Sequence, residues 1–167
     1  PALLISDYLE AGLEQSLANM QNFKATNGRM KVLSGVNGSV IIDDTYNASP
    51  KAVTNALSQL QGMKGRRIAV LGDMLELGSA SEAEHKRIGM LSKECADVLI
   101  TVGLRSRAIA EGALDNGMKE GWILECDNSA IAGQELLQII KNGDVILVKG
   151  SQGMRKEKVV EKIVSDT

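Results

Sequence analysis

Aromatic side chains are scarce in this chain of 167 residues, where Tyr8, Phe23, Tyr46 and Trp122 are the only four. Proteins that stack nucleic-acid bases need several exposed rings, so no such surface is expected. The net charge of −2 points the same way, because nucleic-acid binding usually requires an excess of lysine and arginine. We therefore expect no nucleic-acid partner.

Cysteine, histidine and long apolar runs are also rare. Cys95 and Cys126 lie far apart without metal-ligand spacing, which predicts free, mostly buried thiols in a reducing cytoplasm. No apolar run approaches the roughly 20 residues of a membrane span and no signal peptide is visible, so we expect a cytoplasmic protein with no membrane partner. The single histidine, His85, has charged neighbours, which predict an exposed position on a helix.

No phosphate loop of the form G-x-x-x-x-G-K-[ST] occurs, and no G-x-G-x-x-G follows an apolar run. The stretch "KGSQGM" (149–154) could hold an anion through its backbone amides, although an ordinary strand-to-helix turn explains its glycines about equally well. The cation of Lys149 slightly favours the functional interpretation.

The chain instead alternates short apolar runs with helical patterns, at 44% hydrophobic and 24% charged residues, as in one globular domain. Asn37-Gly38 predicts a hairpin turn, Ser49-Pro50 a helix start, and Ser81 with Glu84 a capping box. Strands are predicted within 27–36, 39–44, 66–73, 97–103, 122–126 and 144–150. Helices are predicted within 6–21, 50–60, 81–96, 105–116, 129–141 and from about Met154 onward.

This alternation predicts an α/β fold with an open, doubly wound, Rossmann-like sheet, mostly parallel, with one antiparallel strand from an N-terminal hairpin. Ligands of such sheets bind outside the carboxyl ends of the strands. The residues expected at this edge are Asp43, Asp44, Asp73, Gly103, Asp127, Lys149 and Ser151.

Two adjacent carboxylates, Asp43 and Asp44, end one predicted strand. They could orient a ribose hydroxyl or approach a magnesium ion bound to phosphates. Alternatively, Asp43 caps a turn and Asp44 is simply solvated. The loop "GDMLELG" (72–78) carries Asp73 and Glu76 and could also reach a ligand, although such a loop is not specific.

A response-regulator receiver would place an acidic pair, an aspartate, a Thr or Ser and a lysine in the order of Asp43-Asp44, Asp73, Thr101 and Lys149. The spacing argues against this class. Only one helix fits between Asp44 and Asp73, where a receiver needs two helices and a strand. Thr101 also lies inside its predicted strand.

Five stretches together resemble the C-terminal part of the MurF family of Mur ligases. They cover essentially the whole chain in order: "GRMKVL", "IIDDTYNASP", "GRRIAVLGDMLELG", "SEAEHKRIG" and "DVILVKGSQGMRKEKVV". One departure is Ser49, where many members carry asparagine, but serine also caps a helix. The resemblance implies a three-domain enzyme of which residues 1–25 are a remnant of the central ATPase domain and residues 26–167 the C-terminal domain. Alone, such a fragment is expected to be inactive.

The resemblance also implies the chemistry. ATP with Mg²⁺, held mainly by the central domain, would phosphorylate the terminal carboxylate of UDP-N-acetylmuramoyl tripeptide. The amine of D-Ala-D-Ala would then attack the acyl phosphate, as a step of peptidoglycan synthesis. By similarity, Arg29, Asp44, Tyr46 and Asn47 would bind the nucleotide, with Asp44 at the ribose, while Asp43 would be structural. No residue of this chain is expected to be a protein nucleophile or a metal ligand.

The dipeptide side is assigned from charge and edge position. Asp73 and Glu76 are candidates for its ammonium, and Lys149, Ser151 and Arg155 for its carboxylate or the acyl phosphate. The N-terminal and central domains of the same chain would be partners. Two alternatives remain open: a sibling ligase that uses a diamino acid or glutamate, and a non-catalytic domain that binds a nucleotide or a partner.

Overall fold

The computed structural model of this chain describes residues 13–21 and 26–165. Helix α2 (Leu13–Gln21) agrees with the helical pattern predicted for residues 6–21 over the part that is described. The remainder of that prediction and the predicted domain boundary at residue 25 lie outside the described residues.

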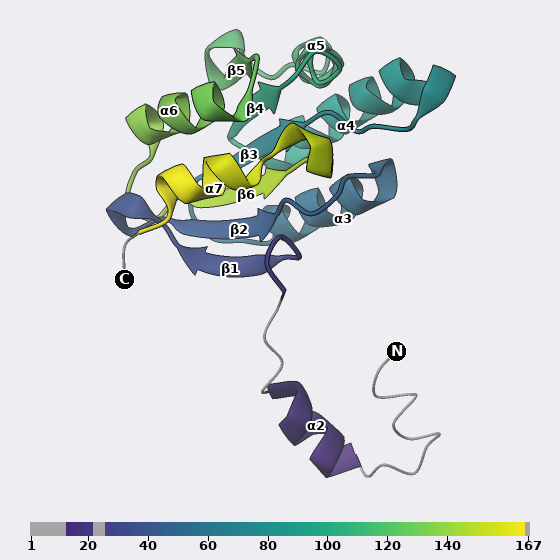
Figure 1. Cartoon of the computed structure of the whole chain (residues 1–167). Coiled ribbons are helices and arrows are strands. Elements are labelled where there is room, and N and C mark those ends of the chain that lie inside the picture. Colours follow the sequence, from purple (N-terminus) through teal and green to yellow (C-terminus); the bar gives the residue numbers. More distant parts are fainter. Residues whose placement is uncertain (1–12, 22–25, 166–167) are drawn as a thin grey trace.

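A six-stranded sheet lies at the centre of the fold, in the order β1-β2-β6-β3-β4-β5 (Figure 1). β1 pairs antiparallel with β2, whereas the pairs β2–β6, β6–β3, β3–β4 and β4–β5 are parallel. This arrangement confirms the predicted α/β fold with its one antiparallel strand. The strands are β1 (Lys31–Ser34), β2 (Val40–Asp44), β3 (Arg67–Gly72), β4 (Val98–Val102), β5 (Ile123–Cys126) and β6 (Val145–Lys149).

The hairpin between β1 and β2 turns at the predicted dipeptide. Asn37 and Gly38 both have positive φ angles, 56° and 72°, and the N–H of Ser39 donates to the carbonyl of Val36 (N···O 3.1 Å). Two successive positive φ angles match the twist of the flanking strands, which explains the preference for Asn-Gly in this turn.

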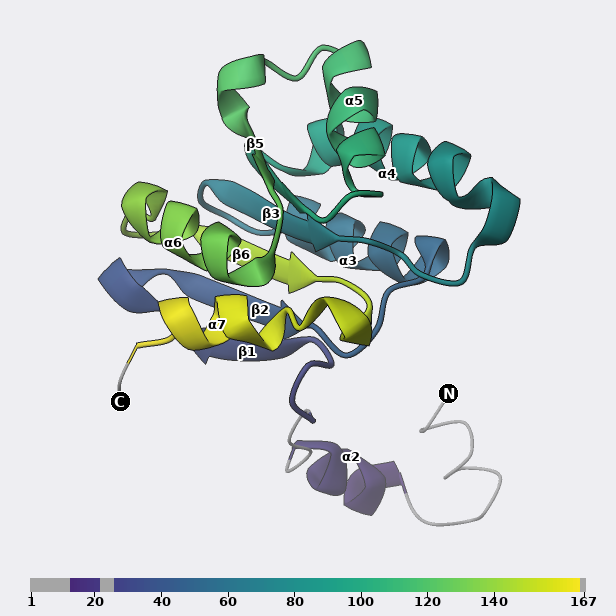
Figure 2. The ribbon, with the colours of Figure 1, turned by 45° about the horizontal axis from the view of Figure 1, so that its top comes forward.

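Helices cover both faces of the sheet, with α3, α4 and α5 on one face and α6 and α7 on the other (Figure 2). Ser49 caps α3 as predicted, since its side chain accepts from the N–H of Ala52 (3.3 Å). The last helix starts later than predicted, because residues Gln152–Met154 form a separate 3-10 turn. The helices are α3 (Pro50–Gln61), α4 (Ser81–Cys95), α5 (Arg107–Asp115), α6 (Ser129–Ile139) and α7 (Glu157–Ile163).

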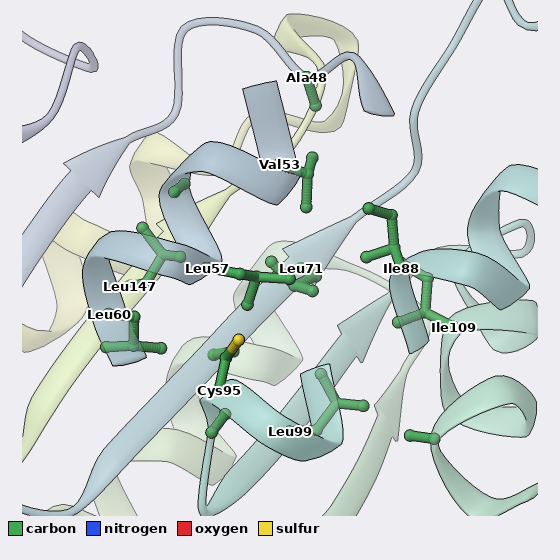
Figure 3. Close-up of a cluster of buried hydrophobic side chains, with 14 of the residues drawn as sticks. Ala48, Val53, Leu57, Leu60, Leu71, Ile88, Cys95, Leu99, Ile109 and Leu147 are labelled. Carbon is green, nitrogen blue, oxygen red and sulfur yellow. The ribbon is translucent and has the colours of Figure 1, made fainter. Parts of the chain in front are cut away.

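Alternate strand residues face the two helical layers, so the sheet divides the core in two. On the α3 face, Leu57 and Leu60 pack with Leu71, Leu99 and Leu147 from the strands (Figure 3). The opposite face buries the neighbouring strand residues against α6 and α7. Burial on both faces explains why the strands are continuous apolar runs rather than alternating ones.

Both cysteines are free and buried, as predicted. Burial raises the pKa of the Cys95 and Cys126 thiols above the ordinary value. Within residues 13–21 and 26–165, no helix has the length and apolar character that crossing a bilayer demands.

The prediction of an exposed His85 is wrong. The side chain is fully buried, and its Nδ1 donates to the carbonyl of Ser81 (2.7 Å) while its Nε2 accepts from the N–H of Met74 (3.0 Å). His85 lies on the helix face of Ile88 and Ser92, three and seven residues later, so helical spacing outweighs its charged sequence neighbours. The imidazole thereby fixes the loop that follows β3.

The predicted capping box at the start of α4 is also wrong. Ala80 occupies the N-cap position in a helical conformation, and no side chain caps the helix there. The preceding 3-10 turn (Gly78–Ala80) leads directly into α4, so Ser81 is already helical. Glu84 instead pairs with Arg87, 2.9 Å away on the helix surface.

The close packing of α4 on α5 generates a stability prediction. A Cβ atom added at Gly89 of α4 would lie 2.1 Å from the carbonyl oxygen of Ile109 in α5. Gly89→Ala should therefore lower the free energy of unfolding by about 1–3 kcal/mol, as overpacking commonly does. Urea unfolding measures the change. Gly121→Ala is the control, because a Cβ there has no neighbour within 4 Å; equal effects of the two variants would contradict the packing argument.

Candidate functional site at the carboxyl edge

Three loops meet beyond the carboxyl ends of β2, β3 and β6. Residues 46–49, 75–77 and 151–153 line a hollow of about 450 Å³ between them. The three strands are adjacent in the sheet, so their following loops necessarily converge at this edge. This hollow is therefore the candidate ligand-binding site.

The carboxylate of Asp43 is used within the domain. It is buried, and it accepts hydrogen bonds from the N–H of Gly28 (3.0 Å) and from the hydroxyl of Thr45 (2.7 Å). Asp43 thus caps the turn after β2 and ties it to the segment that precedes β1. This is a structural role, one of the two alternatives that the sequence left open.

Asp44 is not simply solvated. Its Oδ2 accepts from the ammonium of Lys149, and its Oδ1 accepts from the N–H of Met30 (3.2 Å). The side chain keeps 15% of its surface exposed. Asp44 therefore joins the end of β2 to β6 and to the segment before β1, while part of its carboxylate remains open to the surface.

An arginine and a tyrosine stack beside this carboxylate. The guanidinium carbon of Arg29 lies 3.8 Å from the ring centre of Tyr46, and both side chains are exposed. The N–H of Tyr46 donates to the carbonyl of Gly28 (2.9 Å), which holds the two segments together. The structure therefore brings together the four residues predicted for the nucleotide: Arg29, Asp44, Tyr46 and Asn47.

Ser151 fastens the three loops to one another. Its buried hydroxyl accepts from the N–H of Leu75 (3.0 Å) and donates towards the carbonyl of Ala48 (3.5 Å). Its own N–H donates to the carbonyl of Asp73 (3.2 Å). The hollow is consequently preorganised by hydrogen bonds across its floor.

The two predicted acidic residues of the β3 loop have different surroundings. Glu76 is exposed at the hollow and has a positive φ of 65°, a strained conformation for a residue with a side chain. Asp73 is buried and accepts from the N–H of Ser106 (2.8 Å), with Arg105 3.8 Å from its other oxygen. Asp73 thus faces the loop after β4.

The remaining predicted substrate residues do not line the 450 Å³ hollow. The ammonium of Lys149 is covered, with 2% of the side chain exposed. Arg155 has a left-handed backbone conformation, and its Nε lies 3.3 Å from Oε1 of Glu157. Together with Asp127, it lines a neighbouring hollow of about 320 Å³. Asp127 is exposed and lies 3.3 Å from Arg107. Of the five predicted substrate residues, Glu76 and Ser151 line the larger hollow.

Sequence reasoning missed one charged residue at this edge. Lys156 is completely buried, and its Nζ lies 3.5 Å from the hydroxyl of Ser129. Its aliphatic chain crosses Gly72 and Gly150, where added Cβ atoms would lie 2.2 and 2.8 Å from it. Burial lowers the pKa of Lys156 to about 7, against the opposing charge of Asp73. The missed signal is its helical spacing from the apolar residues of α7.

The part of the chain that the structure describes contains no group of three or more His, Cys, Asp or Glu that could hold a metal ion.

Residues 28–152 match the family described as Mur ligase, glutamate ligase domain. The UDP-N-acetylmuramoyl-tripeptide–D-alanyl-D-alanine ligase of Bacillus subtilis is 32% identical over 98% of this chain and 36% of its own length. The ligase of the same name from Escherichia coli is 34% identical over 97% of this chain and 35% of its own length. The chain thus spans about a third of the length of these curated relatives.

The fold of this chain is also similar to that of solved MurF structures. MurF from Acinetobacter baumannii superposes with a TM-score of 0.79 at 28% identity, covering 92% of this chain and 34% of that one. The MurF ligase of Thermotoga maritima, solved in complex with ADP, superposes with a TM-score of 0.71 at 28% identity, covering 88% of this chain and 35% of that one.

Replacing Lys156 should stabilise the domain in a pH-dependent way. The unfolded chain binds the lysine proton up to the ordinary pKa of 10.5, whereas the folded chain releases it above about 7. Burial of the charged lysine therefore lowers the free energy of unfolding by its full amount below pH 7, and by less and less as the pH rises above 7. Lys156→Met should raise the free energy of unfolding, and the gain should be about 2 kcal/mol larger at pH 6 than at pH 9.

Urea unfolding at the two pH values measures these gains. Lys158→Met is the control, because Lys158 is an exposed lysine two residues further along. A gain of the same size at pH 6 and pH 9 would show that Lys156 keeps its charge in the folded domain, against the prediction.

Proposed function

Because this chain belongs to the Mur ligase family, whose glutamate ligase domain matches residues 28–152, we propose that it is the C-terminal domain of a cytoplasmic ATP-dependent ligase. The ligase adds D-Ala-D-Ala to UDP-N-acetylmuramoyl tripeptide in peptidoglycan synthesis. One structural observation carries the nucleotide part: the exposed Arg29–Tyr46 stack beside the partly exposed carboxylate of Asp44. The names of the curated relatives support the choice of substrates.

The boundary between two domains of the ligase falls after residue 25. Residues 1–25 belong to the central domain and residues 26–167 to the C-terminal domain. The phosphate loop and the groups that hold Mg²⁺ belong to the central domain of the whole ligase, and the chain's coverage of about a third of its relatives is consistent with this. When bound, Mg²⁺ would neutralise charge on the transferred phosphate.

The reaction proceeds in two steps. The γ-phosphoryl group of ATP passes to the terminal carboxylate of the tripeptide, which gives an acyl phosphate and ADP. The amine of D-Ala-D-Ala then attacks the acyl carbon, and inorganic phosphate leaves from the tetrahedral intermediate as the amide forms. This chemistry depends on positioning and on neutralising charge, so the domain contributes binding groups rather than a nucleophile.

On the nucleotide side, Arg29 offers a cation that the stack on Tyr46 holds in place. A carboxylate has about four acceptor positions, and the bonds of Asp44 to Met30 and Lys149 leave room for a ribose hydroxyl. Asn47 is exposed at the same rim and completes the pocket with Tyr46.

On the dipeptide side, the exposed carboxylate of Glu76 is the best-placed acceptor for the substrate ammonium. Asp73 would contribute negative charge without direct contact, because its buried carboxylate already accepts from the loop after β4. Ser151 and Arg155 would contact the substrate carboxylate or the acyl phosphate from the hollow and from its neighbour. These roles rest on charge complementarity at one sheet edge.

Phosphate release by the full-length natural polypeptide tests the reaction. With ATP and UDP-N-acetylmuramoyl tripeptide, release should occur with D-Ala-D-Ala but not with a diamino acid or glutamate. The 167-residue chain alone should release none. Release with another amine would move the protein to a sibling ligase, and no release with any amine would leave a non-catalytic binding domain.

Substitutions at the nucleotide side should weaken the full-length enzyme. Asp44→Ala and Arg29→Ala each remove a charged partner, so each should lower kcat/KM for ATP by about 10- to 100-fold. Steady-state kinetics measures the loss, and Arg87→Ala is the control because this exposed arginine lies on the outside of α4. Unchanged kinetics in both variants would remove the proposed nucleotide site.

A further inference from the structure

Lys149 lies at the carboxyl end of β6, directly beside Asp44 in the parallel pairing of β6 with β2. Its side chain is 2% exposed. The ammonium donates to the carboxylate of Asp44 and to the carbonyl oxygen of Asn47, 2.9 Å away. Both partners come from the nucleotide side, and neither comes from the loop that carries Glu76.

Removing an ammonium from water costs free energy, which an opposite charge and hydrogen-bond acceptors can compensate. The two partners of Lys149 provide this compensation. The lysine thereby holds the carboxylate of Asp44 and the carbonyl of Asn47 against the end of β6, one of the two middle strands of the sheet. An ammonium engaged in this way is poorly placed to receive a substrate carboxylate.

The effect of Lys149 extends through Asp44 to the stacked pair. The second oxygen of Asp44 accepts from the N–H of Met30, whose positive φ of 53° is unusual for a residue with a side chain. Met30 directly follows Arg29, which rests on Tyr46. The carboxylate of Asp44 is therefore one of the groups that position the backbone next to Arg29, together with Asp43 and Tyr46, which both bind Gly28.

We propose that Lys149 is a positioning residue for the nucleotide: it acts through Asp44 and Asn47 and does not bind the dipeptide. The inference rests on the proposed function, because it presumes that the Arg29–Tyr46 side receives ATP. It differs from the assignment of Lys149 to the substrate carboxylate or the acyl phosphate, which charge and edge position suggested.

The experiment compares two affinities in the full-length protein. Lys149→Met should weaken ADP binding, measured by titration calorimetry, by about tenfold or more, as for a lost charge-assisted contact. The KM for D-Ala-D-Ala should stay within about twofold, because the lysine does not touch that substrate. Lys64→Met is the matched control, because Lys64 is an exposed lysine that precedes β3, at the edge of the sheet away from the site. It should change neither the ADP affinity nor the KM for D-Ala-D-Ala.

A double-mutant cycle separates an effect through Asp44 from an independent one. If Lys149 acts in part through Asp44, Lys149→Met should weaken ADP binding by a clearly smaller factor when Asp44→Asn is already present than in the wild type. Thermal unfolding checks that each variant is folded. Should Lys149→Met not fold, Lys149→Gln, which keeps a donor for the Asn47 carbonyl, takes its place in both measurements.

A raised KM for the dipeptide with unchanged ADP affinity would overturn the inference, as would fully independent effects in the cycle. Failure of the proposed function looks different. A wild-type protein that binds ADP but releases no phosphate with any amine would refute the ligase, while the ADP measurements would still decide the role of Lys149. A wild-type protein that binds no ADP would refute both.

Discussion

Insertion of β6 between β2 and β3 is the constraint on which the candidate site depends. β6 is the last strand in the sequence but lies inside the sheet. Its carboxyl end therefore meets residues that precede it by 76 and 105 positions in the sequence. Lys149 thereby reaches Asp44, and Ser151 reaches the loops that follow β2 and β3. Without this strand order, the same residues would lie at one edge but would not be joined.

The pleat of β6 and the turn after it also separate two buried lysines. Lys149 lies on the α3 face, where a carboxylate and a carbonyl satisfy its ammonium. Lys156 lies on the α7 face against Gly72, and its ammonium donates to the hydroxyl of Ser129 over a long distance of 3.5 Å. The first lysine has a carboxylate and a carbonyl as partners, whereas burial of the second outweighs the nearby charge of Asp73 and lowers its pKa to about 7. Burial alone therefore does not define the role of a lysine.

Local features of this fold could be predicted because they depend on a few neighbouring residues. The Asn37-Gly38 turn and the Ser49 cap follow from backbone and hydrogen-bond preferences, and the strands follow from apolar runs. The prediction for His85 was wrong because its immediate neighbours are charged, and Lys156 was overlooked for the same reason, although each lies at helical spacing from buried residues. The ion pair between β2 and β6 could not be predicted at all, since an edge position does not reveal which strands are adjacent.

The adjacent carboxylates at the end of β2 illustrate what strand geometry decides. Successive side chains on a strand point to opposite faces, so Asp43 points with Ile41 towards α7 and Asp44 with Ile42 towards α3. Two carboxylates that diverge in this way cannot act as an acid–base dyad on one group. Asp43 instead holds the segment before β1, and Asp44 keeps free acceptor positions beside Arg29. One member of the pair therefore holds the segment that enters the domain, and the other keeps part of its carboxylate exposed at the proposed nucleotide site.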